Sequence, residues 1–94
     1  MVPKMDFTEI FGDSAQVKLV QFLLKTRGNL MNLSEIARRT MVANSTVGRV
    51  IQNLIKIGLV AEVKVGNMMK VIYLVENHHL TRSLLKLQEE FVSK

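Results

Sequence analysis

Polar and basic side chains recur along residues 44–57 at a spacing that suits contact with a nucleic acid. At about 100° per residue, a helix there has an apolar half and a polar half. The apolar half comprises Val47, Val50, Ile51 and Leu54. The polar half comprises Ser45, Arg49, Gln52, Asn53 and Lys56, with no acid among them. One side can therefore pack while the other enters the major groove of DNA. An ordinary solvated helix face, the alternative, usually carries Glu or Asp.

The first turns of this helix carry side chains suited to specific contacts. Arg49 can donate two parallel hydrogen bonds to O6 and N7 of guanine. Ser45 and Thr46 lie at the helix N-terminus, where hydroxyls and free backbone N–H groups can bind phosphates or base edges. Asn44, at the start of the helix, belongs to the same set of candidate DNA-binding residues.

The second half of the helix carries candidates whose roles stay open. Gln52 and Asn53 can read adenine or contact the DNA backbone. Lys56 can bind a phosphate or remain solvated. Gly48 costs roughly 0.8–1 kcal/mol relative to alanine inside a helix. Either its bare backbone lets DNA or a partner helix come close, or the cost is simply tolerated.

Further basic residues flank this helix in the chain. Lys64 and Lys70 lie close to the tip of an expected hairpin, and Asn67 lies at the tip. These side chains can contact phosphates or the minor groove, although lysines also protect exposed strand edges. Arg38 and Arg39 end the preceding helix, where they can bind phosphates or complement the helix dipole. All five are candidate DNA-binding residues.

The positive charge is concentrated in the middle of the chain. The 94 residues carry a net charge of +5, with a sequence pI of about 9.9. Between Ile36 and Tyr73 there are six basic residues and a single acid, Glu62. A block of this kind favours an anionic partner.

Catalysis, metal binding and membrane insertion find little support in the sequence. The absence of cysteine excludes disulfides and thiolate chemistry. No acid pair, Ser–His–Asp arrangement or glycine-rich phosphate loop can be assembled, so we expect no enzyme, no cofactor and no metal. His78 and His79 should diverge by about 100° as exposed residues at a helix start; a metal shared across a dimer is the alternative. With no signal peptide or membrane span visible, we expect a cytoplasmic protein.

The elements that position these residues follow from periodicity and capping. A helical turn is expected over residues 6–11, followed by helices from Asp13 or Ser14 to about Lys25, over 32–40, and from Ala43 or Asn44 to Ile57. Asn32 and Glu35 have the spacing of a capping box. Strands are expected over 59–65 and 70–75 around a tip at 66–69, and Asn77 should cap a last helix over 78–93.

This order predicts a fold that is mainly α with a small β-hairpin (α+β): a winged helix-turn-helix with N- and C-terminal dimerisation helices. It forms one domain over residues 1–94, with a core at about 13–75. The apolar residues expected at the dimer contact are Phe7, Phe11, Leu80, Leu84, Leu87 and Phe91. An isolated helix of about 16 residues is marginal in water, so the last helix must pack on something. A second copy related by a two-fold axis can cover this surface with its own identical surface. Such a dimer also places two recognition helices one DNA turn apart, which suits an inverted repeat.

The stretch 11–73 resembles the winged-helix transcription regulators of the ArsR/MarR-like group. FGDSAQVKLVQFLL is similar to their opening helix, NLSEIARRT to their second helix, and STVGRVIQNLIKIGLV to their recognition helix. The resemblance implies DNA contact at Ser45, Thr46 and Arg49, a wing in the hairpin, and dimerisation through the terminal helices. Two positions depart from the group: Met41 replaces the usual turn glycine, and Ala43 replaces the usual capping serine. The cysteine motif of the metal sensors is missing.

These observations favour a homodimeric, sequence-specific regulator of transcription that represses by covering a promoter. Two alternatives use the same fold for other work: a plasmid partition protein that binds a centromere or an architectural protein that coats DNA, and a protein–protein interaction module without DNA binding. An unknown small-molecule or protein effector also remains open.

Overall fold

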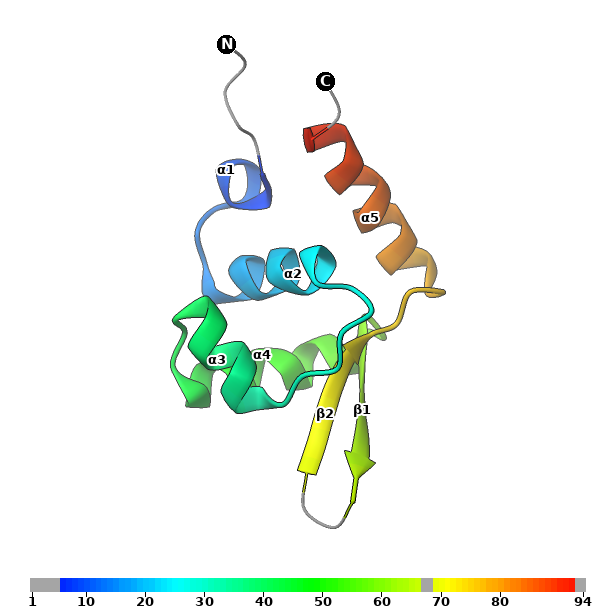
Figure 1. The fold of residues 1–94 in the computed structure, drawn as a ribbon. Coiled ribbons are helices and arrows are strands. Elements are labelled where there is room, and N and C mark those ends of the chain that lie inside the picture. Colours follow the sequence, from blue (N-terminus) through cyan, green and yellow to red (C-terminus); the bar gives the residue numbers. More distant parts are fainter. Residues whose placement is uncertain (1–5, 67–68, 93–94) are drawn as a thin grey trace.

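The computed structural model describes residues 6–66 and 69–92, and its elements follow the expected order (Figure 1). The described residues contain α1 (Phe7–Phe11), α2 (Ala15–Lys25), α3 (Leu33–Thr40), α4 (Asn44–Lys56), β1 (Val60–Val65), β2 (Met69–Leu74) and α5 (His79–Val92). The two strands form an antiparallel hairpin at the opposite end of the molecule from α1 and the end of α5. This arrangement confirms the mainly α fold with a small hairpin, a winged helix-turn-helix.

Three helices begin at side chains that accept a hydrogen bond from the first turn. The pairs are Asp6 with the N–H of Glu9 at 3.1 Å, Ser14 with Val17 at 3.2 Å, and Asn32 with Glu35 at 2.8 Å. Each cap satisfies a backbone donor that has no partner inside the helix. The sequence therefore placed the starts of α1, α2 and α3 within a residue.

The first helix is fixed to the body of the protein by one aromatic residue. Phe7 is 2% exposed, and its ring meets that of Phe91 edge-on at 5.1 Å between centroids. Its backbone N–H donates to Oε1 of Gln21 at 2.8 Å, which ties α1 to α2. At the cap, a hydrogen bond from the Thr8 hydroxyl holds the pKa of the Asp6 carboxyl below its ordinary value. These contacts join the two ends of the chain over α2.

The last helix begins one residue later than expected and has a different cap. Residues 75–78 form a turn in which the N–H of His78 donates to the Val75 carbonyl at 3.4 Å. Nδ1 of His78 then accepts from the N–H of Leu80 at 3.1 Å, so His78 caps α5 and the expectation for Asn77 is wrong. His78 is half-buried rather than exposed, and its ring stacks on that of His79 at 4.6 Å instead of diverging from it.

The core gathers on both sides of α2. Its large side chains with no more than 2% exposure are Phe7, Leu19, Leu23, Leu24, Ile36, Val47, Ile51, Leu54, Leu59, Val60 and Ile72. Aliphatic residues from α2, α3, α4 and the hairpin thus form one continuous cluster. The hairpin joins it because Met31 bridges Ile72, with N···O distances of 3.2 and 2.7 Å.

Two remote segments meet at Gly58, directly after α4. Gly58 has φ +86°, a conformation that side chains with a Cβ rarely adopt. A Cβ there would lie 2.8 Å from Nε2 of His78. The end of α4 and the cap of α5 are therefore in contact only because residue 58 has no side chain.

Replacing Gly58 or Gly48 with alanine should therefore change the free energy of unfolding in opposite directions. We expect Gly58→Ala to lower the free energy of unfolding by about 1–3 kcal/mol, through backbone strain and displacement of His78. Gly48→Ala should raise it by about 0.8–1 kcal/mol, because Gly48 is helical and a Cβ there meets nothing within 4 Å. Urea denaturation of both variants measures the difference. Equal effects would contradict the contact between Gly58 and His78.

Candidate nucleic-acid interface

Helix α4 is divided as its sequence predicts. Val47, Val50, Ile51 and Leu54 are buried, with no more than 5% exposure. Ser45, Arg49, Gln52, Asn53 and Lys56 are exposed, as is Asn44, while Thr46 is half-buried. The polar stripe is therefore open along the full length of the helix, and the structure brings these candidates onto one surface.

The turn into α4 keeps its tight geometry without glycine. Met41 ends α3 in the left-handed region at φ 60° and ψ 34°, and the Val42 N–H donates to the Ala37 carbonyl at 3.3 Å. A side chain in this conformation costs about 1–2 kcal/mol. The Met41 side chain is 91% exposed, so its burial does not offset this strain.

The start of α4 is left without a side-chain cap. Ala43 occupies the cap position and has no polar side chain. Its carbonyl accepts from the N–H of Val47 at 2.9 Å, which closes the first turn. The first N–H groups of a helix have no partner inside it, and here no side chain caps them, so they are available to an anion at the end that carries Ser45 and Thr46.

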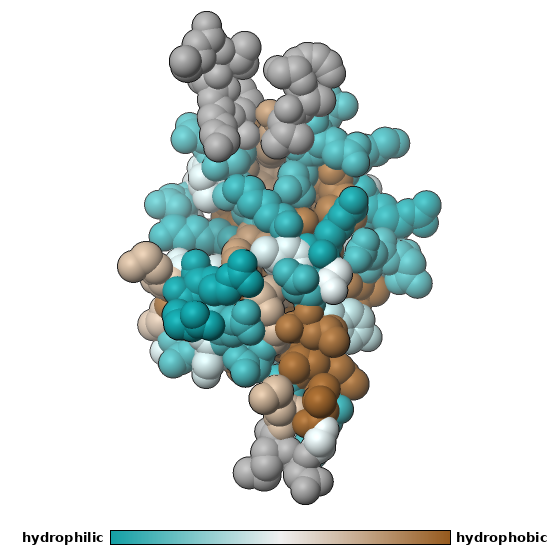
Figure 2. All heavy atoms as spheres, viewed as in Figure 1, coloured by the Kyte–Doolittle hydropathy of each residue, from teal (hydrophilic) through white to brown (hydrophobic). Residues whose placement is uncertain are grey.

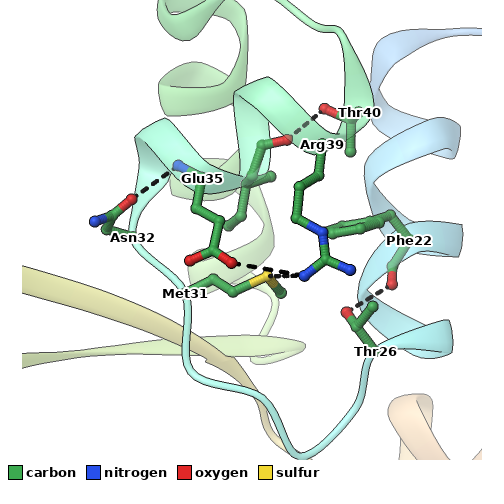
Figure 3. A network of polar contacts seen from close by, with 8 residues as sticks. Phe22, Thr26, Met31, Asn32, Glu35, Arg39 and Thr40 are labelled. Atoms are coloured by element: carbon green, nitrogen blue, oxygen red, sulfur yellow. Dashed lines mark hydrogen bonds and ion pairs between the residues drawn. The ribbon is translucent and has the colours of Figure 1, made fainter.

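Arg39 contacts three side chains of its own chain, although 41% of its own side chain remains exposed (Figure 3). Its guanidinium carbon lies 5.2 Å from the centroid of the Phe22 ring. Nη1 lies 3.6 Å from a carboxylate oxygen of Glu35 and 3.6 Å from Sδ of Met31. Because Glu35 turns toward Arg39, only half of the capping box forms: Asn32 accepts from the Glu35 N–H. Arg39 thus braces α3 against α2, a role that neither sequence interpretation contained.

The neighbouring Arg38 and the hairpin lysines are differently placed. Arg38 is exposed at the end of α3. Lys64 and Lys70 are exposed cross-strand partners near the tip of the hairpin. Lys70 also lines a shallow groove together with the start of α3. Asn67 lies outside the described residues.

The terminal residues expected to form a dimer contact fall into two groups. Leu80, Leu84, Leu87 and Phe91 are half-buried against the core of their own chain. Phe7 is fully inside its own chain, whereas Phe11 and Ile10 of α1 are 58% and 50% exposed. A second subunit would therefore meet α1 mainly through Phe11 and Ile10.

The described residues contain no cluster of three or more potential metal ligands and no helix able to cross a membrane.

One buried polar side chain in the described part of the chain lacks a hydrogen-bond partner. Thr81 of α5 is fully buried, and its Oγ1 has no hydrogen-bond partner. Sequence patterns gave no signal for Thr81 or for the cap at His78, because both depend on contacts between distant segments.

Comparison with known proteins places this geometry in a family. Residues 17–64 match the IclR helix-turn-helix domain. The chain belongs to the IclR helix-turn-helix domain family. The match runs from α2 through α3 and α4 into β1, so it contains the turn, the polar stripe and the first strand of the hairpin. Kinship with ArsR and MarR regulators is accordingly approximate and holds at the level of the winged fold.

A solved structure shares the fold of this IclR-type domain. The chain is similar to MepR, crystallised as a glutamine-to-proline mutant from a multidrug-resistant S. aureus clinical isolate, with a TM-score of 0.60 and 21% identity. The similarity covers 92% of this chain and 60% of the MepR chain. No curated protein sequence matches the chain.

Proposed function

We propose that this IclR-type domain binds duplex DNA with sequence preference and regulates transcription, acting as a repressor that covers a promoter. The observation that carries the proposal is the exposed, acid-free stripe of α4, located in the second helix of a helix-turn-helix. In that fold, the second helix enters the major groove and its N-terminal residues face base edges. The uncapped first turn of α4 supports the same orientation, since its free N–H groups suit a phosphate.

The polar side chains divide into contacts that read bases and contacts that position the protein. Arg49 lies in the middle of the stripe and forms two hydrogen bonds with guanine. Gln52 and Asn53 follow along the groove. Lys64 and Lys70 of the hairpin contact phosphates beside the groove, and Arg38 contacts a phosphate at the end of α3. Because Arg39 is held by Phe22 and Glu35, it serves DNA binding by positioning α3.

Binding should be salt-sensitive and selective. Neutralising several phosphates releases counterions, so we expect affinity to fall steeply between about 50 and 200 mM salt. A mobility-shift titration on duplexes from the protein's own upstream region and on scrambled duplexes measures both properties. Folded protein that shifts no duplex even at low salt would exclude the proposed function.

Arg49→Ala should reduce sequence preference, whereas Lys64→Ala should reduce only affinity. Loss of a bidentate base contact costs about 1–3 kcal/mol on the preferred site and relaxes the preference there. Loss of Lys64 should weaken binding about equally on preferred and scrambled duplexes. Arg82→Ala, which removes a positive charge from the exposed surface of α5, is the matched control. Equal losses on both duplexes for Arg49→Ala would make Arg49 a backbone contact.

We also propose that the protein binds DNA as a homodimer joined through α1 and α5. The support is the exposed pair Ile10 and Phe11 beside the half-buried row of α5, which leaves apolar surface at both chain ends. A two-fold axis there lets two copies of α4 address an inverted repeat.

If α1 and α5 form the dimer contact, one negative charge introduced into it should separate the subunits. Phe11→Glu should give a single-chain mass at low micromolar concentration, because it places a carboxylate in an apolar contact. Leu30→Glu changes a residue of similar exposure in the loop after α2 and should leave the dimer intact. Analytical ultracentrifugation gives both masses. A single-chain mass for the unchanged protein would rule out this dimer.

A further inference from the structure

The two faces of the hairpin differ in chemistry. Directly opposed residues of an antiparallel pair share a face. One face holds the pairs Val60–Leu74, Glu62–Ile72 and Lys64–Lys70, which comprise core residues and charges. The other face, here called the outer face, holds Ala61–Tyr73, Val63–Val71 and Val65–Met69. All six residues of the outer face are aliphatic or aromatic, so the lysines and the apolar residues point in opposite directions.

Much of the outer face is open to solvent. Val63, Val65, Met69 and Tyr73 are 43%, 49%, 49% and 37% exposed. Figure 2 shows hydrophobic side chains gathered over the hairpin, at the lower end of the molecule. The exposed apolar side chains of the hairpin therefore gather on the face that does not carry the lysines.

The edge of the sheet beside this face is also open. The sheet has the order β1–β2, and β2 is bridged on its other edge by Met31. Among the described residues, no strand pairs with the outer edge of β1. An unpaired strand edge exposes a row of N–H and C=O groups that can template another strand. The sequence of β1, VAEVKV, contains no proline, and its two charges, Glu62 and Lys64, have opposite signs.

We propose that β1 pairs antiparallel with β1 of a second copy of this chain, with the two Val63 residues opposite each other. In this register Glu62 opposes Lys64 of the partner subunit, and Lys64 opposes Glu62 of the partner subunit. Ala61 opposes Val65 of the partner subunit in the same reciprocal way. The register follows from the spacing of the two charges on either side of Val63.

The charges of Glu62 and Lys64 favour a second copy of this chain as the partner and favour this register. Two opposite-charge pairs stabilise neighbouring strands, whereas like charges directly opposed destabilise them. A shift by one residue would turn the apolar side chains to the wrong face and separate both charge pairs. The result is a four-stranded sheet with a continuous apolar outer face. The pairing is distinct from the terminal contact of α1 and α5, and it does not require DNA.

The absence of native cysteine allows a direct test. Directly opposed residues of an antiparallel pair have Cα atoms about 4.5–5.5 Å apart, within the range that a disulfide spans. Val63→Cys protein, mildly oxidised without DNA, should form a covalent dimer on a non-reducing gel. In Val65→Cys protein the two sulfurs would be four residues apart along the strands, about 14 Å, so no dimer should form. An equimolar mixture of Ala61→Cys and Val65→Cys should cross-link again.

Charge reversal provides a second measurement on the same cysteine variant. Glu62→Lys in the Val63→Cys chain should slow cross-linking severalfold, because two like-charged pairs replace two opposite-charged pairs. Adding Lys64→Glu to that chain should restore the rate. Both residues are exposed, so folding should be unaffected, and circular dichroism checks it. If Val63→Cys does not cross-link, or cross-links no faster than Val65→Cys, the pairing is wrong, whatever the result of the DNA titration.

Discussion

The burial of one face of α4 against α2 is the interaction on which the rest of the structure depends. Val47, Ile51 and Leu54 have no more than 1% exposure, and Leu19 and Leu24 of α2 lie in the same core cluster. Burying such a side chain contributes about 1.5–3 kcal/mol. This contact therefore fixes the rotation of α4 about its own axis. The exposed polar stripe is a direct consequence, since its residues occupy the half of the helix that packing leaves free.

Helix α3 adds a contact of a different kind at the surface. Arg39 spreads over the Phe22 ring while Glu35 balances its charge. A flat guanidinium suits this role because it stacks and donates hydrogen bonds in the same plane. The same helix is anchored by Ile36 and Ala37, which are buried in the core, so the strained backbone at Met41 follows a helix that packing holds in place.

Much of this fold follows from local patterns in the sequence. The starts of the first three helices were predictable because Asp6, Ser14 and Asn32 act on their own first turns. The faces of α4 were predictable because helical periodicity determines them. The partners of Arg39, the burial of Phe7 and the cap at His78 were not. Each depends on a segment distant in sequence, and only the assembled core brings the two together.

The contact between Gly58 and His78 links two segments that are distant in the chain. Gly58 directly follows the helix that carries the polar stripe, and His78 begins the last helix. The 19 residues between them contain the hairpin. Any side chain at position 58 would have to displace the imidazole that caps α5. The end of the helix that carries the polar stripe and the start of the last helix therefore share one packing constraint, although the hairpin separates them in the chain.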